Sequence, residues 1–255
     1  MTLHARCQLA VLAIGLPMAA AHAQQLPTRG DSLTPRRPMP FAPGEKLEYR
    51  VSYGPFHVGH GSMELEAPDT VRGVPTYHAV FRVAGGTFFF RVDDRMESWF
   101  HTTTLTSLRF TQNLHEGHYH AQRDFEMFPA ERRYERVGDT SHATVAAPLD
   151  DISFLYFVRT LALRVGAEYR FDRYFQLEGN PIILRVLRQE QITVPAGTFS
   201  AIVVQPLITT GGIFSQKGHA EVWLRADGGH EVLQMNAHVV FGSISLVLTH
   251  AEATP

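Results

Sequence analysis

The chain has 255 residues, of which 44% are hydrophobic and 19% are charged, and its formal net charge is −2. This composition is typical of a folded globular protein and excludes a low-complexity chain. A net charge so close to zero gives no overall field that would attract nucleic acid, so no nucleic-acid partner is expected.

The first 23 residues have the three parts of a secretory signal peptide. Residues 1–6 are a short basic start, residues 7–20 are an apolar run, and Ala21-His22-Ala23 is a small-x-small cleavage site. We therefore expect cleavage after Ala23 and a mature protein that is periplasmic or secreted. The apolar run is too short to span a membrane, and no transmembrane segment is expected elsewhere. The one cysteine, Cys7, would be removed with the signal, so the mature protein is expected to lack disulfides.

A proline-rich segment comes next. Residues 24–43 contain five prolines among Gly, Ser, Thr and Arg, with no apolar period. Such a composition is typical of an extended, flexible tether. Residues 44–252 are then predicted to form a single β-rich domain.

Within this domain the dominant pattern is an alternation of apolar and polar residues, which predicts β-strands. The first strand places Leu47, Tyr49, Val51 and Tyr53 on one face. The expected strands are 46–53, 56–66, 76–83, 88–100, 106–115, 119–128, 132–137, 169–176, 182–193, 198–206, 219–224, 231–239 and 243–250. Short turns between successive strands favour antiparallel pairing. The predicted fold is therefore mainly β, with a strongly curved antiparallel sheet or open half-barrel.

One segment, at about residues 150–164, has the pattern of an apolar helix. Asp150 or Asp151 can cap its N-terminus, and Arg164 and Gly166 can close its C-terminus. Its apolar residues cover most of its circumference: Ile152, Phe154, Leu155, Phe157, Val158 and Leu161. We expect this helix to be inserted in the hollow of the curved sheet, either filling it or acting as a gate.

Arg159 is the charged residue within this apolar helix, and a buried arginine needs a carboxylate partner. Asp94 lies in phase with the apolar residues of its predicted strand, so we expect Asp94 and Arg159 to meet inside the sheet. Two interpretations remain open: a structural salt bridge, or a polar anchor for a ligand head group. In the second case Tyr156, Phe157 and Trp99 would be the aromatic residues of the ligand site.

A second group of candidate site residues is His115, His118 and His120. If Glu116-Gly117 is a two-residue turn, His115 lies opposite His118, and the three imidazoles share one face of a hairpin. Such a set could bind zinc or copper. A solvated hairpin tip without a metal is the alternative interpretation, and the sequence favours it.

Motifs for catalysis and for cofactor binding are missing. The chain has no Gly-x-Ser-x-Gly elbow, no phosphate-binding glycine-rich loop and no His-Glu-x-x-His helix. No catalytic residue and no cofactor is therefore predicted. The sequence leaves open whether the protein is an enzyme and favours a non-enzymatic role.

Several segments resemble, in order, a bacterial envelope family known as domain of unknown function 3108. They are FAPGEKLEY (41–49), VGHG (58–61), DDRMES (93–98), DISFLYFVR (151–159), VPAGTF (194–199) and AEVWL (220–224). The resemblance runs from about residue 41 to 248 and implies an exported protein with a curled antiparallel sheet and no established activity. A bent sheet wrapped on a helix is also, more loosely, similar to periplasmic lipoprotein carriers of the half-barrel type.

These observations favour a monomeric exported protein that binds or carries an apolar or amphipathic envelope ligand, a lipid or acyl chain, on the concave side of the sheet. A scaffold role with an envelope-protein partner is the first alternative. An enzyme that acts on envelope polysaccharide or lipid is the second.

Overall fold

The computed structural model describes residues 38–86, 90–209, 220–239 and 242–252. Within these residues, fifteen strands form one antiparallel sheet, and the predicted mainly β fold is confirmed. The expected signal peptide, most of the expected tether and the first residues of the strands expected at 88–100 and 219–224 lie outside the described residues. Within the described ranges, no helix has the length and apolar character needed to span a membrane.

The first nine strands precede the helix. They are β1 (Lys46–Tyr53), β2 (Phe56–Leu65), β3 (Asp69–Val71), β4 (Val74–Gly86), β5 (Arg91–His101), β6 (Ser107–Glu116), β7 (Tyr119–Phe128), β8 (Arg133–Arg136) and β9 (Ser141–Ala143). The helix α1 (Asp151–Arg159) is followed by β10 (Glu168–Phe171), β11 (Ile182–Val194), β12 (Gly197–Leu207), β13 (Glu221–Arg225), β14 (Val232–Val239) and β15 (Gly242–Glu252). The short strands β3 and β9 were not expected, since three residues are too few for a recognisable alternation.

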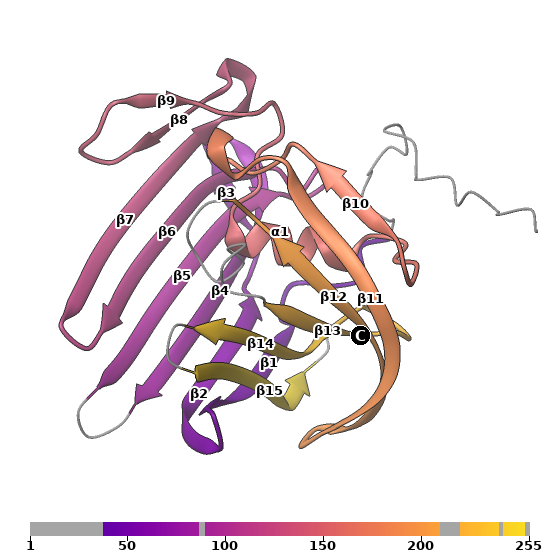
Figure 1. Cartoon of the computed structure of the whole chain (residues 1–255). Helices are drawn as coiled ribbons and strands as arrows, with labels where there is room; N and C mark the ends of the chain where they lie inside the picture. Colours follow the sequence, from indigo (N-terminus) through magenta and orange to yellow (C-terminus); the bar gives the residue numbers. More distant parts are fainter. Residues whose placement is uncertain (1–37, 87–89, 210–219, 240–241, 253–255) are drawn as a thin grey trace, which may run out of the picture.

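The strand order is β10-β11-β12-β13-β14-β15-β1-β2-β4-β5-β6-β7-β8-β9, with β3 paired to β4. The first and last parts of the chain therefore meet at the β15–β1 pair in the middle of the sheet. The long strands β5 to β7 lie on one side of the molecule and the β11–β12 hairpin on the other, with α1 between them (Figure 1).

Two local features allow the sheet to curl. Register shifts occur in five strand pairings, for example between Val186 and Arg188 in the pairing of β11 with β12, and a bulge bends and twists its strand. Gly59 faces Gly85 where β2 and β4 approach so closely that a Cβ on Gly59 would lie 2.2 Å from the carbonyl oxygen of Ala84. A side chain at this position would separate the two strands, which is the physical reason for glycine.

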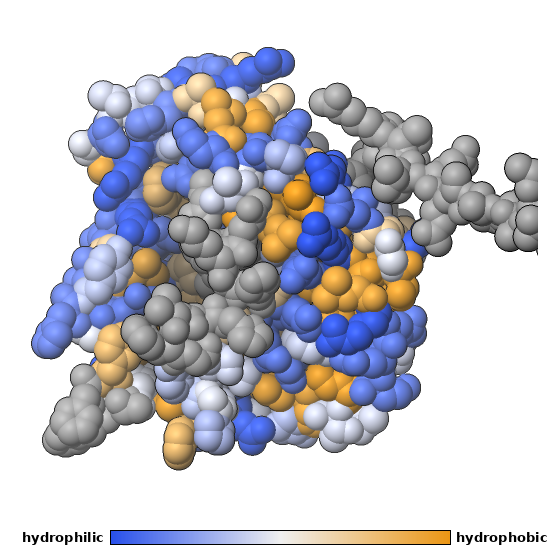
Figure 2. All heavy atoms as spheres, in the orientation of Figure 1, coloured by the Kyte–Doolittle hydropathy of each residue, from blue (hydrophilic) through white to orange (hydrophobic). Residues whose placement is uncertain are grey.

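The hydrophobic core lies between the helix and the inner face of the sheet. In β1, the inward residues Leu47, Tyr49 and Val51 are buried as the alternation predicted, whereas Tyr53 is 39% exposed. Every residue of α1 from Ile152 to Arg159 is buried. Figure 2 shows polar residues over much of the outer surface, with hydrophobic residues between them over the part that carries β10 to β12. The helix therefore fills the described part of the hollow.

The N-terminus of the helix is capped as predicted, but its C-terminus is not. Asp150 is the N-cap, and its side chain accepts hydrogen bonds from the backbone N–H groups of Ile152 and Ser153. The helix ends at Arg159, because the Thr160 N–H turns back to Phe157 and its hydroxyl also donates to that carbonyl at 2.7 Å. The expected closure at Arg164 and Gly166 is therefore wrong.

Asp151, beside the cap, gives a first testable prediction. Burial and the charge of Asp150 raise the pKa of the Asp151 carboxyl to about 7, although a hydrogen bond from the Tyr174 hydroxyl acts in the opposite direction. Since the unfolded chain releases this proton near pH 4, the folded state binds more protons between about pH 4 and 7, and the free energy of unfolding falls as pH rises through that window. We expect Asp151→Asn to be more stable than wild type at pH 8 by about 1–3 kcal/mol and nearly equal to it at pH 4. Urea denaturation at pH 4, 6 and 8 measures this, and parallel pH profiles for the two proteins would contradict it.

Candidate functional site

Arg159, the last residue of α1, makes a buried ion pair with Glu45, which directly precedes β1. Its Nη1 and Nη2 donate to the two Glu45 carboxylate oxygens at 2.6 and 2.7 Å, and its Nε donates to the Gly229 carbonyl at 3.1 Å. The guanidinium lies 5.2 Å from the ring centre of Phe41 and 5.3 Å from that of Tyr156. Burial disfavours the charged form, but the hydrogen bonds and charge of Glu45 outweigh it and raise the pKa of Arg159.

The predicted contact between Arg159 and Asp94 is wrong. The Asp94 carboxylate accepts a hydrogen bond from the His115 backbone N–H at 2.9 Å and lies beside Glu116. Burial raises the pKa of both of these carboxyl groups. On β5, Ser98 donates to the N-cap residue Asp150 and the Phe100 ring contacts Tyr156 of the helix, so Asp94 is in the correct phase but lies at least four residues too early in the strand.

Glu45 is a residue that the sequence analysis missed, although its pattern contained the signal. It is in phase with Leu47, Tyr49 and Val51, whose side chains face the core, so it extends the inward face of β1 by one position. A carboxylate at the end of a buried face is a natural partner for a buried arginine.

The three aromatic residues predicted to bind a ligand do not converge on one site. Tyr156 and Phe157 are 1% and 0% exposed and are packed in the core, where the Phe157 ring contacts Phe171. Trp99 lies on the opposite face of β5, stacked on His78 with the ring centres 4.2 Å apart. Packing in the core explains Tyr156 and Phe157, and stacking on His78 at the outer face of the sheet explains Trp99.

The predicted arrangement of His115, His118 and His120 is also wrong. His115 pairs with His120, the ring centres lying 5.0 Å apart, and the two-residue turn is Gly117-His118. Gly117 has φ +61°, as the first central position of a type II′ hairpin turn requires, and this displaces the expected turn by one residue. In the described part of the chain, no three His, Cys, Asp or Glu side chains are placed to hold a metal ion.

A pocket of about 410 Å³ lies under the tip of the β11–β12 hairpin, and we call it the hairpin pocket. Its lining residues come from four segments of the chain: Glu45, Leu47, Pro195, Ala196, Phe199, Arg225, Glu231, Leu233, Leu248, Thr249, His250 and Ala251. No local sequence pattern joins these segments, so sequence reasoning had no means to find the pocket.

The pocket exists because neighbouring strands differ in length. β14 pairs with β15 only as far as Gln234 and Val247, whereas β15 continues beside β1 to Glu252. The hairpin tip closes over this stretch of β15, which does not pair with β14. There the Ala196 N–H donates to the Leu248 carbonyl at 3.2 Å. The space between the end of β14 and the hairpin tip is the hairpin pocket.

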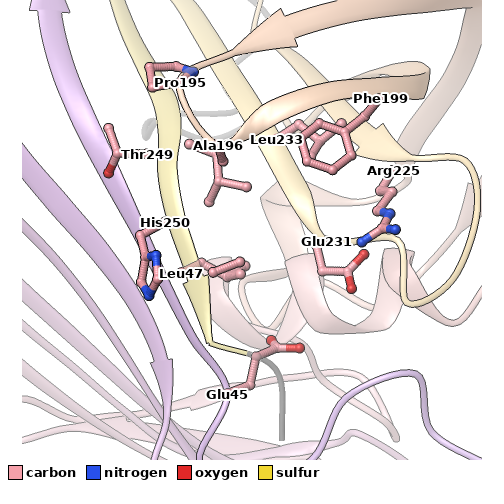
Figure 3. A pocket seen from close by; sticks show the side chains of 12 residues that line it. Glu45, Leu47, Pro195, Ala196, Phe199, Arg225, Glu231, Leu233, Thr249 and His250 are labelled. Atoms are coloured by element: carbon pink, nitrogen blue, oxygen red, sulfur yellow. The ribbon is translucent and has the colours of Figure 1, made fainter. Parts of the chain in front are cut away.

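Leucine side chains lie behind the lining of the hairpin pocket, and charged side chains lie at one end of it. Leu47, Leu233 and Leu248 contribute side chains that are almost fully buried. Figure 3 shows Glu45 and Glu231 on one side of the pocket and Pro195 on the opposite side. Almost none of the leucine surface is therefore accessible from the pocket, and the accessible lining is at least as polar as it is apolar.

Most of the charged groups at the polar end have partners within the protein. Both carboxylate oxygens of Glu45 are bonded to Arg159, and the Arg225 Nε donates to Asp227 at 3.2 Å. Glu231 differs, since its buried Oε2 has no hydrogen-bond partner among the described residues. The Oε2 atom of Glu231 is thus an unused acceptor, although the charge of this carboxylate also acts on the buried Arg159.

Comparison with one solved structure supports the fold. The chain is similar to a beta-barrel-like protein of domain of unknown function DUF1849 from Brucella abortus, with 8% identity, a TM-score of 0.55, and coverage of 84% of this chain and 99% of that one. Two further structures have TM-scores of 0.38: a Parabacteroides distasonis protein described as a lipoprotein (12% identity, 84% and 97% coverage) and a Bacteroides fragilis protein described as exported, with a YmcC-like fold (11% identity, 84% and 98% coverage).

Comparison of sequences identifies the family. No curated protein matches this chain. The model of the family described as "Protein of unknown function (DUF3108)" matches residues 48–249, which is most of the chain and agrees with the order of motifs in the sequence. The chain therefore belongs to the DUF3108 family.

Proposed function

We propose that this protein is an exported, non-enzymatic binding protein that holds the apolar part of an amphipathic ligand in the hairpin pocket. The observation that supports the proposal is the pocket itself, with about 410 Å³ of space and a lining to which Pro195, Ala196 and Phe199 contribute apolar atoms beside charged groups. This volume lies at the lower end of the range for small-molecule sites, so it suits one small ligand such as a single short acyl chain.

The proposal places the ligand at a different point from the centre of the sheet. The hollow around α1 is filled by the helix itself, whose side chains are buried along its length. The hairpin pocket lies at the C-terminal end of the helix, beside Glu45, where the strands leave space. We further propose that residues 1–23 are a signal peptide cleaved after Ala23. The expected tether of residues 24–43 is shorter than expected at its C-terminal end, because Phe41 is packed in the core against Tyr156, and we propose that the part before Pro40 tethers the domain.

Ala196→Trp tests this proposal. Ala196 lies at the hairpin tip and lines the pocket, so an indole at this position would occupy the space that the ligand needs. We expect wild-type protein to bind an uncharged apolar fluorescent probe such as N-phenylnaphthylamine, and the variant to bind it at least about tenfold more weakly, a loss of about 1.4 kcal/mol. Ala130→Trp, at an exposed position remote from the pocket, is the matched control and should bind as wild type does.

A scaffold role is the second candidate function, and the filled hollow favours it. A scaffold would show no probe binding by wild type and no ligand in extracts of the protein purified from the periplasm. Equal binding by wild type and Ala196→Trp would place any probe site outside the hairpin pocket and would contradict the proposal.

A further inference from the structure

The exposed large aromatic side chains of the described residues gather at the tips of three hairpins. Between 39% and 69% of the surface of each is exposed, and they are Tyr53, Phe56, Phe90 and Tyr119. The first two flank the β1–β2 turn, the third lies between β4 and β5, and the fourth begins β7 after the β6–β7 turn. We call these four residues the aromatic tip row.

Strand register places the three tips side by side. One line of paired residues crosses the six neighbouring strands β1, β2, β4, β5, β6 and β7, and its members are Val51, Gly59, Gly85, Val92, Glu116 and Tyr119. Each residue of the aromatic tip row lies on this line or within three residues of it. Because neighbouring strands lie about 4.8 Å apart, the line is roughly 24 Å long. In Figure 1 this end of the sheet faces the lower left.

Backbone contacts hold the tips in place. The Gly54 N–H in the β1–β2 turn donates to the Ser243 carbonyl at 2.9 Å. The Gly117 N–H in the β6–β7 turn donates to the Arg91 carbonyl at 2.7 Å, and a Cβ on Gly117 would lie 2.7 Å from the Phe90 ring. Single exposed apolar residues need no explanation, but a set gathered at one end of a molecule is typical of an interaction surface.

The form of the row favours a lipid bilayer as the partner over a protein. The rings stand on three separate tips, so they do not form the continuous, densely packed patch that is typical of the core of a protein interface. A fluid interface receives separate rings without a preformed pocket. Tyrosine, with an apolar ring and a polar hydroxyl, is also enriched at the level of the lipid head groups.

The charges near the row indicate which lipid it fits. Three arginines and three acidic residues lie on the line of paired residues, within two residues of it, or in contact with Tyr119: Arg50, Arg91, Arg123, Asp93, Asp94 and Glu116. These charges balance, as they do in a zwitterionic head group. Arg50 and Arg91 are exposed and have no ion-pair partner in the described part of the chain, so their guanidinium groups are available to lipid phosphates.

We propose that the aromatic tip row binds the head-group region of a zwitterionic lipid bilayer. The four rings lie among the head groups, and the guanidinium groups of Arg50 and Arg91 donate to lipid phosphates. Binding strength at such an interface increases with the apolar area that is buried in it. This inference does not depend on ligand binding in the hairpin pocket.

Flotation with phosphatidylcholine vesicles tests the proposal on protein purified after export. We expect wild-type protein to bind, and the double variant Phe56→Ser with Phe90→Ser to bind at least about tenfold more weakly. Val165→Ser with Leu177→Ser removes two exposed apolar side chains outside the row and should bind as wild type does. Exchange of a quarter of the lipid for phosphatidylglycerol should change binding by less than about threefold, because the charges near the row balance.

Phe56→Trp gives a second measurement that keeps an aromatic ring at the tip. Brominated lipid should quench the fluorescence of this variant more than that of wild type, whereas Leu177→Trp should show no added quenching. The proposal is overturned if wild-type protein does not bind the vesicles or if the serine double variant binds them equally. It is also overturned if wild-type protein sediments as a dimer that this double variant dissociates, because the row would then be an interface between two copies of the chain.

Discussion

Replacing Glu45 with glutamine should lower the free energy of unfolding by about 3–5 kcal/mol, because it leaves the fully buried guanidinium of Arg159 without its anionic partner. The two carboxylate oxygens of Glu45 accept from Arg159 at 2.6 and 2.7 Å, and the side chains are 6% and 0% exposed. The remaining acceptors of Arg159 are the backbone carbonyls of Gly229 and Pro40, which supply no charge. Urea denaturation of the two proteins measures the difference.

A matched control lies three residues along the chain. Glu48→Gln makes the same chemical change in an exposed pair with Lys46, where the expected effect is below about 1 kcal/mol. The double variant Glu45→Leu with Arg159→Met should recover most of the lost stability, because a buried ion pair can be replaced by apolar residues without large cost. A loss of less than about 1 kcal/mol in Glu45→Gln would contradict this prediction, because it would mean that solvent stabilises the charge of Arg159 when Glu45 does not.

This ion pair also shows how far the sequence could predict the structure. Alternation placed Leu47, Tyr49 and Val51 on the inner face, and the apolar helix was expected in the hollow; both rest on local periodicity, which the fold preserves. The need of Arg159 for a carboxylate was also predictable from physical chemistry. Both Glu45 and Asp94 are in phase with inward-facing residues, and the choice between them was not predictable, because it depends on where the ends of the helix lie relative to β1 and β5.

The turn after β6 was predicted wrongly for a local reason, and the hairpin pocket was missed for a non-local one. Glu116-Gly117 and Gly117-His118 are both reasonable two-residue turns, and only the backbone conformation of Gly117 chooses between them. The hairpin pocket depends on β14 being shorter than β15 and on the β11–β12 hairpin closing over the remainder. Such differences in strand length become visible only when the whole sheet has curled.

The other end of the helix should be nearly as sensitive. Asp150 is fully buried, and its side chain accepts four hydrogen bonds: two from the backbone N–H groups of Ile152 and Ser153 and two from the hydroxyls of Ser98 on β5 and Ser107 on β6. Asp150→Ala removes the cap, worth about 1–2 kcal/mol, and leaves two buried hydroxyls without their acceptor. We expect a total loss of about 3–5 kcal/mol in the free energy of unfolding, measured by urea denaturation.

Asp150→Asn separates the two contributions. Asparagine is as good an N-cap as aspartate, so its side-chain oxygen keeps the contacts to the helix, and the serine hydroxyls can rotate to accept from its amide. The loss should therefore be less than half of that in Asp150→Ala, and Asp93→Ala, at an exposed position of β5, should change little. Because Glu45 holds one end of the helix and Asp150 the other, a large loss at both positions means that the helix is a fixed part of the core. A wild-type stability in Asp150→Ala would instead mean that the N-terminal end is free to move, and the helix would then act as a gate to the hollow.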